Sequence, residues 1–179
     1  MSPESILDFW FNELSSKQQF SKDPVLDQMI RNRYLDALKS ASQCELFGWR
    51  TSPQGRLAEI LILDQFSRNI YRNSAQAFAQ DRLALALAQE LIERGDDLQL
   101  NTVQRPFAYM PFMHSESALI HEQAVKLFSQ IGLEQSLRFE IRHKAIIDRF
   151  GRYPHRDELL GRESTPDELS FLKESGSSF

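Results

Sequence analysis

The stretch Leu57–Arg72, LAEILILDQFSRNIYR, decides the fold class because its apolar residues recur at helical rather than strand spacing. On a wheel drawn at about 100° per residue, Ile62, Phe66 and Ile70 fall on one side. The polar residues share a separate sector: Asp64, Gln65, Arg68 and Asn69. The pattern therefore predicts a central helix with a polar tip.

Two interpretations of this polar tip remain open. Asp64 stands four residues before Arg68, the favourable order for an ion pair within one helix. Such a pair, when buried, can fix the register of a helix without any further role. It can also line a pocket, since charged groups in clefts are candidates for functional sites.

Helix-start signals recur along the rest of the chain, and no segment shows sustained strand alternation. The predicted starts are Ser2-Pro3, Asp23-Pro24, Pro53, Ser74, Pro106, Ser115, Gln135 and the capping box Thr165-Pro166-Asp167-Glu168. The predicted stops are Gly95, Gly132 and Gly151. We expect Pro111 to kink or end the helix that starts at Pro106, and residues 175–179 to be frayed.

These signals predict an all-α protein with a single domain over residues 1–179. Helices joined by short turns suggest antiparallel pairs stacked as a degenerate tetratricopeptide-like array, because no strict 34-residue repeat is present. The predicted core residues are Leu61, Leu63, Phe66, Leu85, Phe112, Phe128, Ile146 and Phe150.

Composition restricts the function classes. The single cysteine, Cys44, cannot form an intramolecular disulfide, and no secretory signal precedes the first helix, so we expect a cytoplasmic protein. The longest aliphatic run, ILIL at 60–63, is far too short to span a membrane. A formal net charge of −4 argues against a protein that coats nucleic acid.

The charge is unevenly distributed along the chain: residues 138–162 contain seven Lys or Arg and only four Asp or Glu. The stretch FGRYPHRDELLGRESTPDEL, residues 150–169, places Arg152, Arg156 and Arg162 close together in the chain. Arginines there can bind a carboxylate or phosphate. His155 can act as a neutral base because nearby arginines lower the pKa of an imidazole, and His114 is an alternative. Alternatively, these arginines cap helix ends and tie a loop to Asp64 and Glu116.

Other chemistries have weaker support. No two histidines share the helical spacing of a zinc peptidase, and no nucleophile elbow or glycine-rich phosphate loop is present. His143 lies on an apolar stripe, where a histidine is more often a hydrogen-bonded core residue than a ligand or base. No metal site is therefore predicted, and the sequence names no cofactor.

Four blocks in order carry a family resemblance: LAEILILDQFSRNIYR at 57–72, AFAQD at 77–81, FAYMPFMHSE at 107–116 and FGRYPHRDELLGRESTPDELSFL at 150–172. The chain resembles the bacterial family catalogued as domain of unknown function 924. The resemblance implies an all-α, tetratricopeptide-like fold and no established activity. The family pattern carries over onto Asp64, Gln65, Arg68, Asn69, Tyr109, His114, Glu116, Arg152, His155, Arg156, Gly161 and Arg162.

The chain departs from the family pattern at two positions. Asp157 follows Arg156 where the family usually has asparagine, and Asn73 stands where it usually has glycine. An acid at 157 is expected to neutralise part of the charge of Arg156.

From these residues we predict a protein that binds a small anionic ligand, with His155 and His114 as candidate acid–base groups. The predicted ligand-binding residues are Asp64, Arg68, Asn69, Tyr109, Glu116, Arg152, Arg156 and Arg162. Arg152 and His155 should fold back onto Asp64, with Tyr109 and His114 closing the third side. A helical-repeat module that binds a peptide or protein, with the polar residues as a brace, is the alternative.

Overall fold

The computed structural model describes residues 1–178, and those residues form helices and turns without a β-strand. The all-α, single-domain prediction is confirmed for this part of the chain. No helix in it is both long and apolar enough to cross a membrane. Successive helices pack on one another, as in a stacked array, but the closer likeness to a tetratricopeptide repeat stays an expectation.

The chain order is given by the following bounds. The α-helices are α1 (Pro3–Asp8), α2 (Ser16–Gln19), α3 (Pro24–Ser42), α4 (Pro53–Leu61), α5 (Ser67–Ile70), α6 (Asp81–Glu93), α7 (Arg105–Met113), α8 (Ala118–Phe128), α9 (Glu134–Phe150) and α10 (Pro166–Phe171). The 3₁₀ turns are η2 (Phe47–Thr51), η4 (Ala75–Phe78), η5 (Asp96–Gln99) and η6 (Pro154–Arg156). The π-helical turns are η1 (Phe9–Glu13) and η3 (Ile62–Phe66).

Several predicted helix ends are confirmed by their capping contacts. Ser2 and Asp23 accept hydrogen bonds from backbone N–H groups at the starts of α1 and α3, and Thr165 forms the capping box of α10 with Glu168. Gly151 follows α9 with a left-handed φ of 70°, the conformation in which glycine is favoured.

One predicted helix start is wrong, and one predicted helix end is not observed. Pro111 lies inside α7, which continues to Met113, so of the two expectations at this proline only the kink stays a prediction. Ser74 caps only the 3₁₀ turn η4, so α6 begins later, at Asp81.

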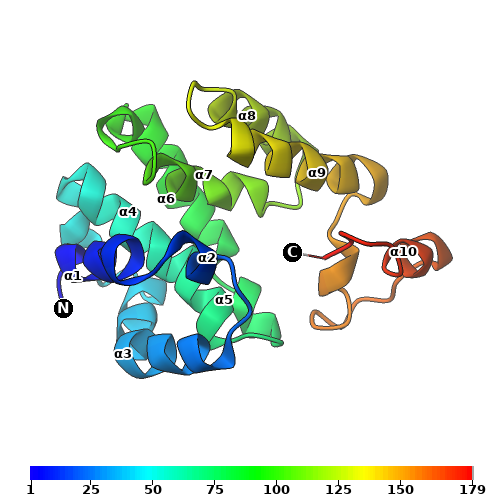
Figure 1. Ribbon diagram of the computed structural model, residues 1–179, viewed down its shortest axis with the longest axis horizontal. Helices are drawn as coiled ribbons and strands as arrows, with labels where there is room; N and C mark the ends of the chain where they lie inside the picture. Colours follow the sequence, from blue (N-terminus) through cyan, green and yellow to red (C-terminus); the bar gives the residue numbers. More distant parts are fainter. Residues whose placement is uncertain (179) are drawn as a thin grey trace.

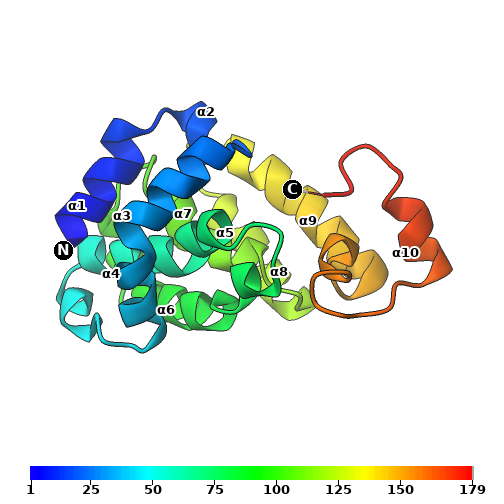
Figure 2. The same cartoon turned by 90° about the horizontal axis from the view of Figure 1, so that it is seen from below.

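The core surrounds one continuous rod, formed by α4, η3 and α5 over residues 53–70 and called here the central rod. Figures 1 and 2 both show this rod enclosed by α1, α3, α6 and α7. Six predicted core residues are buried, whereas Leu85 and Phe150 are half-buried. Helix α6 instead turns Ala84, Ala88 and Leu91 inward, and Phe150 packs on Phe171.

Residues 151–178, called here the C-terminal arm, stand to one side of the helical body in both views (Figures 1 and 2). The arm packs against the end of α9 through a small separate apolar cluster, in which Ile146 and Ile147 of α9 and Tyr153 of the arm are buried. The arm therefore depends largely on polar contacts for its position. Of the tail predicted to be frayed, Ser177 is buried and donates to the Leu172 carbonyl at 3.1 Å, while residue 179 lies outside the described residues.

Candidate functional site

The polar tip of the central rod lies in the π-helical turn η3. In a π turn the usual hydrogen-bond ladder is shifted by one residue. The hydroxyl of Ser67 donates to the Leu63 carbonyl at 2.7 Å, and Arg68 Nη1 donates to the Asp64 carbonyl at 2.8 Å. Side chains thus supply bonds to carbonyls within the turn, and the Asp64 carboxylate is held at the surface of the rod. Turns of this kind often mark functional sites, although η1 shows that one can also belong to the core.

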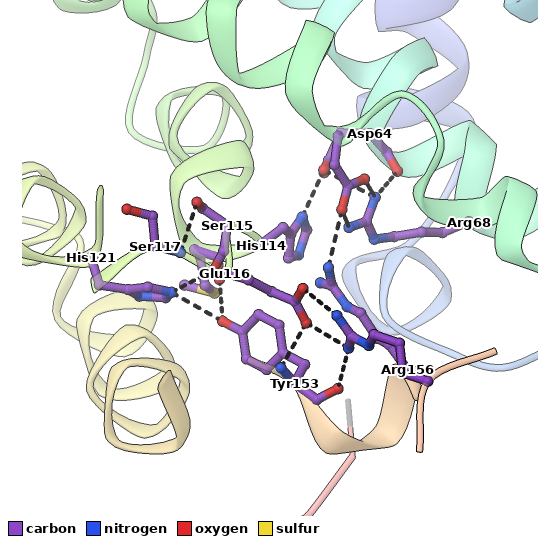
Figure 3. Close-up of polar contacts among 12 residues, drawn as sticks. Asp64, Arg68, His114, Ser115, Glu116, Ser117, His121, Tyr153 and Arg156 are labelled. Atoms are coloured by element: carbon purple, nitrogen blue, oxygen red, sulfur yellow. Dashed lines mark hydrogen bonds and ion pairs between the residues drawn. The ribbon is translucent and has the colours of Figure 1, made fainter. Parts of the chain in front are cut away.

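Asp64 is the centre of a compact polar cluster (Figure 3). Its carboxylate is 1% exposed and accepts a hydrogen bond from His114 Nδ1 at 2.6 Å. Arg68 Nη1 lies 3.2 Å from the same oxygen, and Gln65 donates to the other oxygen at 2.5 Å. His114 comes from the turn that ends α7, so the cluster joins two helices that are distant in sequence.

The charges in this cluster determine which proton His114 carries. Burial disfavours the Asp64 carboxylate, but Arg68 and His114 outweigh burial and hold the pKa of that carboxyl well below its usual range. Burial, reinforced by Arg68, lowers the pKa of His114, so its imidazole is neutral near pH 7. With Nδ1–H donated to Asp64, Nε2 has a lone pair and no hydrogen-bond partner among residues 1–178.

Two arginines share one acid on the side of the cluster nearest the arm. Arg68 donates two hydrogen bonds to Asp81, at 2.9 and 3.0 Å, and Arg156 Nη1 donates to Asp81 at 3.2 Å. Arg156 is only 6% exposed, yet neither its Nε nor its Nη2 has a hydrogen-bond acceptor among the described residues. Burial, and then the charge of Arg68, lowers the pKa of Arg156. This guanidinium is therefore short of negative charge.

Aromatic rings hold the Arg156 guanidinium in place. The rings of Phe78 and Tyr153 lie 4.6 and 4.5 Å from its central carbon. Figure 3 shows Arg156 and Tyr153 approaching from the arm, opposite Asp64 and Arg68 of the central rod. We refer below to Asp64, Arg68, Asp81, His114 and Arg156 as the Asp64 cluster.

The remaining arginines of the arm form a second network. Arg162 makes two hydrogen bonds to Glu116, at 2.7 and 2.9 Å, and one to Asp157 at 2.8 Å. Glu116 also accepts from the backbone N–H of Tyr153 at 2.7 Å. Arg152 makes two hydrogen bonds of 2.7 Å to Glu168 at the start of α10. This network ties the arm to the body and to its own last helix.

Comparison with known proteins identifies the family of this chain. Residues 6–176 match the family model described as "Bacterial protein of unknown function (DUF924)". The chain belongs to this family. A solved structure of the protein of unknown function ATU0120 from Agrobacterium tumefaciens is similar, with a TM-score of 0.88, 36% identity and coverage of 97% of each chain. No curated protein matches the sequence.

The structure brings only some of the family's polar residues together. His114 and Arg156 lie in the Asp64 cluster, and Glu116 and Arg162 lie beside it in the second network. Arg152 does not meet Asp64, because its guanidinium pairs with Glu168 and lies 3.4 Å from Asp157. A ligand-binding role for Arg152 stays a prediction from the sequence alone.

Asn69 and Tyr109 also lie elsewhere. Asn69 donates to Asp27 of α3 at 2.8 Å and is therefore paired outside the Asp64 cluster. Tyr109 is fully buried; it donates to Asp97 at 2.5 Å and accepts from Gln130 at 3.0 Å. These contacts explain both residues structurally, whereas their predicted ligand contacts stay predictions.

Asp157 does not neutralise Arg156, contrary to the expectation from its departure from the family pattern. Its carboxylate instead binds Arg162 and accepts from Ser164 at 2.9 Å. Phe78 and Asp81, which both contact Arg156, are not among the predicted site residues. Both belong to the AFAQD block, so the signal was present in the family motif.

The other three histidines surround Tyr153. His121 Nε2 lies 3.2 Å from the tyrosine oxygen, and the His143 and His155 rings lie 5.8 and 5.5 Å from the tyrosine ring. His143 also bonds to the Phe139 carbonyl at 2.8 Å, as a core histidine would. Residues 1–178 contain no group of three or more His, Cys, Asp or Glu placed to hold a metal ion.

Acid should weaken the fold through these histidines. Burial lowers the pKa of His143 to about 3, and burial together with Arg156 lowers that of His155 to about 4. Below pH 6.5, near the ordinary pKa of histidine, these side chains are protonated in the unfolded chain but stay neutral in the folded chain. The free energy of unfolding should therefore fall by up to about 1.4 kcal/mol per pH unit for each histidine as the pH drops from 6.5 toward the folded pKa.

Urea unfolding measured at pH 7, 6 and 5 tests this prediction. Between pH 6.5 and about 5 the carboxylates contribute little, because their ordinary pKa values lie near 4. His143→Gln should flatten the decrease because it removes one titrating group. An equal decrease in that variant would show that His143 does not carry the effect.

Proposed function

We propose that this protein binds a small anionic ligand at Arg156, with His114 as the acid–base group of the same site. The observation that carries the proposal is the Nε–Nη2 edge of Arg156, which is held in a buried guanidinium without an acceptor among residues 1–178. A buried charge without enough partners costs several kcal/mol. Nε itself has almost no accessible surface, so an anion that reaches the guanidinium would meet Nη2 and supply the missing charge there.

The placement of His114 supports an acid–base role. Its Nδ1 is fixed by Asp64, so the lone pair on Nε2 has a defined direction. A carboxylate–imidazole pair of this kind orients a general base and stabilises its protonated form. Arg68 and Asp81 act electrostatically on both His114 and Arg156, which connects the two parts of the site. His155, the other candidate, has its ring against Tyr153 and a pKa lowered to about 4, and Asp64 orients His114 rather than His155.

The second candidate is a helical module whose polar residues only brace the arm. It is favoured by the second network, in which Arg152 and Arg162 each have a carboxylate within hydrogen-bond distance. We therefore assign bracing to Arg152 and Arg162 and ligand binding to Arg156. Ligand binding predicts that an anion stabilises the fold and that this stabilisation depends on Arg156. Bracing alone predicts that no anion stabilises the fold.

Thermal unfolding in sodium acetate or sodium phosphate, at constant ionic strength set by sodium chloride, separates the two functions. Ligand binding should raise the Tm of the wild type by about 5–10 °C when the anion exceeds its Kd a hundredfold. Arg156→Gln should lose this increment. Arg152→Gln is the matched control: it should melt earlier without anion, because Glu168 loses its partner, yet keep the full increment.

The result that would reject the binding proposal is an increment that survives in Arg156→Gln, or one that neither anion produces in the wild type. In the second case the brace remains as the role of the polar residues. Far-ultraviolet circular dichroism of each variant at low temperature checks that its helices are intact.

A further inference from the structure

We propose that His121 and Glu140 form a buried pair that holds one shared proton and positions the turn carrying His114 and Glu116. His121 belongs to α8 and Glu140 to α9, and both side chains are 0% exposed. The pair lies outside the Asp64 cluster. Only its link to acid–base chemistry rests on the proposed function, through the role of His114.

The hydrogen bonds of His121 determine how many protons the pair holds. Nδ1 lies 2.7 Å from Oε1 of Glu140, and Nε2 lies 2.8 Å from the carbonyl oxygen of Ser115. A carbonyl oxygen can only accept, so Nε2 carries a hydrogen, and a second hydrogen lies between Nδ1 and Oε1. A neutral imidazole beside an ionised carboxylate has one hydrogen for these two contacts. The pair therefore holds one proton more than that combination and has no net charge.

Burial places the second proton on Glu140. Its Oε2 atom is buried and has no hydrogen-bond partner among residues 1–178. An ionised carboxylate with a buried, unpartnered oxygen is costly, and a neutral carboxyl group costs much less. Burial also raises the pKa of Glu140. The carboxyl group thus donates from Oε1 to Nδ1, and His121 is a neutral imidazole with its hydrogen on Nε2.

The pair acts on the turn between α7 and α8, residues 114–117. His121 donates from Nε2 to the Ser115 carbonyl, and the hydroxyl of Tyr153 donates to the Met113 carbonyl at 2.5 Å (Figure 3). Two buried donors from different parts of the fold therefore hold two carbonyls at the start of this turn.

The turn carries both polar residues that reach toward the arm. Ser115 lies between His114, which contacts Asp64, and Glu116, which contacts Arg162. A change in the direction of the Ser115 carbonyl would rotate the backbone on which both side chains stand. His121 acts directly on that carbonyl, and Glu140 acts through His121 by keeping the ring hydrogen on Nε2. Both are positioning residues for His114.

Folding should take up one proton at this pair above pH 6.5. In the unfolded chain at such pH values, a histidine is mostly neutral and a glutamate is ionised, so the two side chains bind one proton fewer than the folded pair. Because the folded state binds more protons, rising pH should lower the equilibrium constant for folding. The decrease should be about tenfold per pH unit while the folded pair keeps its proton.

The other ionisable groups that face the pair are His143 and Lys144 of α9 and Tyr153 of the arm. Burial lowers the pKa of His143 and raises the pKa of Tyr153, so both stay neutral in the folded chain between pH 7 and 9. Lys144 donates to Asp148 at 2.7 Å, a contact that a substitution at Glu140 leaves in place.

Urea unfolding of the wild type and of Glu140→Gln at pH 7, 8 and 9 tests the shared proton. The glutamine amide can donate to Nδ1 as the neutral carboxyl group does, but it cannot release a proton. The variant should therefore lack the pair's tenfold change per pH unit. Glu122→Gln is the matched control, because Glu122 is an exposed acid on α8, and it should keep the wild-type dependence. The same pH dependence in Glu140→Gln and the wild type would overturn the proposal.

The titration of His114, followed by proton nuclear magnetic resonance, tests the positioning role. Replacing both members by leucine removes the donor to the Ser115 carbonyl, which should loosen the turn and expose His114 to water. The pKa of His114, which burial lowers, should then rise toward its ordinary value of about 6.5. Glu140→Gln should leave that pKa unchanged, because the amide preserves the orientation of His121.

An unchanged His114 pKa in the double leucine variant would overturn the positioning role. If that variant does not fold, Glu140→Leu carries the same measurement, since it removes only the group that fixes the hydrogen on Nε2, and an unchanged pKa there would have the same meaning. Neither measurement contains an anionic ligand. Failure of anion binding at Arg156 would therefore reject the proposed function and leave the shared proton and the positioning of His114 standing.

Discussion

Phe66→Ala should lower the free energy of unfolding by about 3–5 kcal/mol, as large aromatic truncations do in packed cores. Phe66 is 0% exposed and lies in the middle of the central rod. Its ring contacts those of Tyr34 at 4.9 Å, Trp10 at 5.6 Å and Phe9 at 6.0 Å. One residue thus joins α3, η1 and the rod, and its truncation leaves a cavity that three elements would have to move to fill.

Urea unfolding followed by circular dichroism measures this loss. Phe47→Ala is the matched control because Phe47 is 71% exposed, and its truncation should change stability by about 0.5 kcal/mol or less. A loss below about 1 kcal/mol for Phe66→Ala would mean that the rod is not the centre of the core.

The sequence could predict the central rod because its signals are local. Apolar spacing around Phe66 identified the buried side, and capping residues such as Asp23 and Thr165 marked helix starts by bonds within one turn. The Asp64–Arg68 ion pair also followed from spacing, and the structure contains it at 3.2 Å. Each of these features depends on residues that are close together in the chain.

The arrangement of the site could not be predicted in the same way. Nothing in the spacing around Asp64 indicates the π turn, or that Asn69 pairs with Asp27 rather than with the cluster. Arg152 and Arg156 stand four residues apart in one motif, yet one pairs with Glu168 and the other with Asp81. Which acid each arginine contacts depends on how the chain turns after Gly151. The partner of Arg152 lies 16 residues later in the chain, and the partner of Arg156 lies 75 residues earlier.

The two arginines differ in their surroundings as well as in their partners. Arg152 is part-exposed and has two close carboxylates, so solvent and protein already balance its charge. Arg156 is buried between aromatic rings, and the one carboxylate that it contacts, Asp81, is shared with Arg68. The same motif therefore supplies a brace with one arginine and a candidate binding group with the other.

Asp64→Asn should lower the free energy of unfolding by about 3 kcal/mol, the lower end of the range for removing one partner of a buried ion pair. The lower end applies because Arg68 keeps its two hydrogen bonds to Asp81 and its bond to the Asp64 carbonyl. The amide keeps the size of the side chain, so the loss reports charge rather than a cavity. The asparagine amide has one oxygen, which can accept from His114 or from Gln65. Its NH2 group would face the other donor, so one of the two hydrogen bonds is lost.

The same substitution should move the titration of His114, followed by proton nuclear magnetic resonance. The Asp64 carboxylate opposes the lowering of the His114 pKa, so its removal should lower that pKa further. Asp36→Asn is the control for an acid whose side chain is 93% exposed, and it should change stability by about 0.5 kcal/mol or less. A raised His114 pKa, or a stability loss no larger than that of the control, would show that Asp64 neither supports the charge of Arg68 nor orients His114. The cluster would then lack the fixed imidazole on which an acid–base role at Arg156 depends.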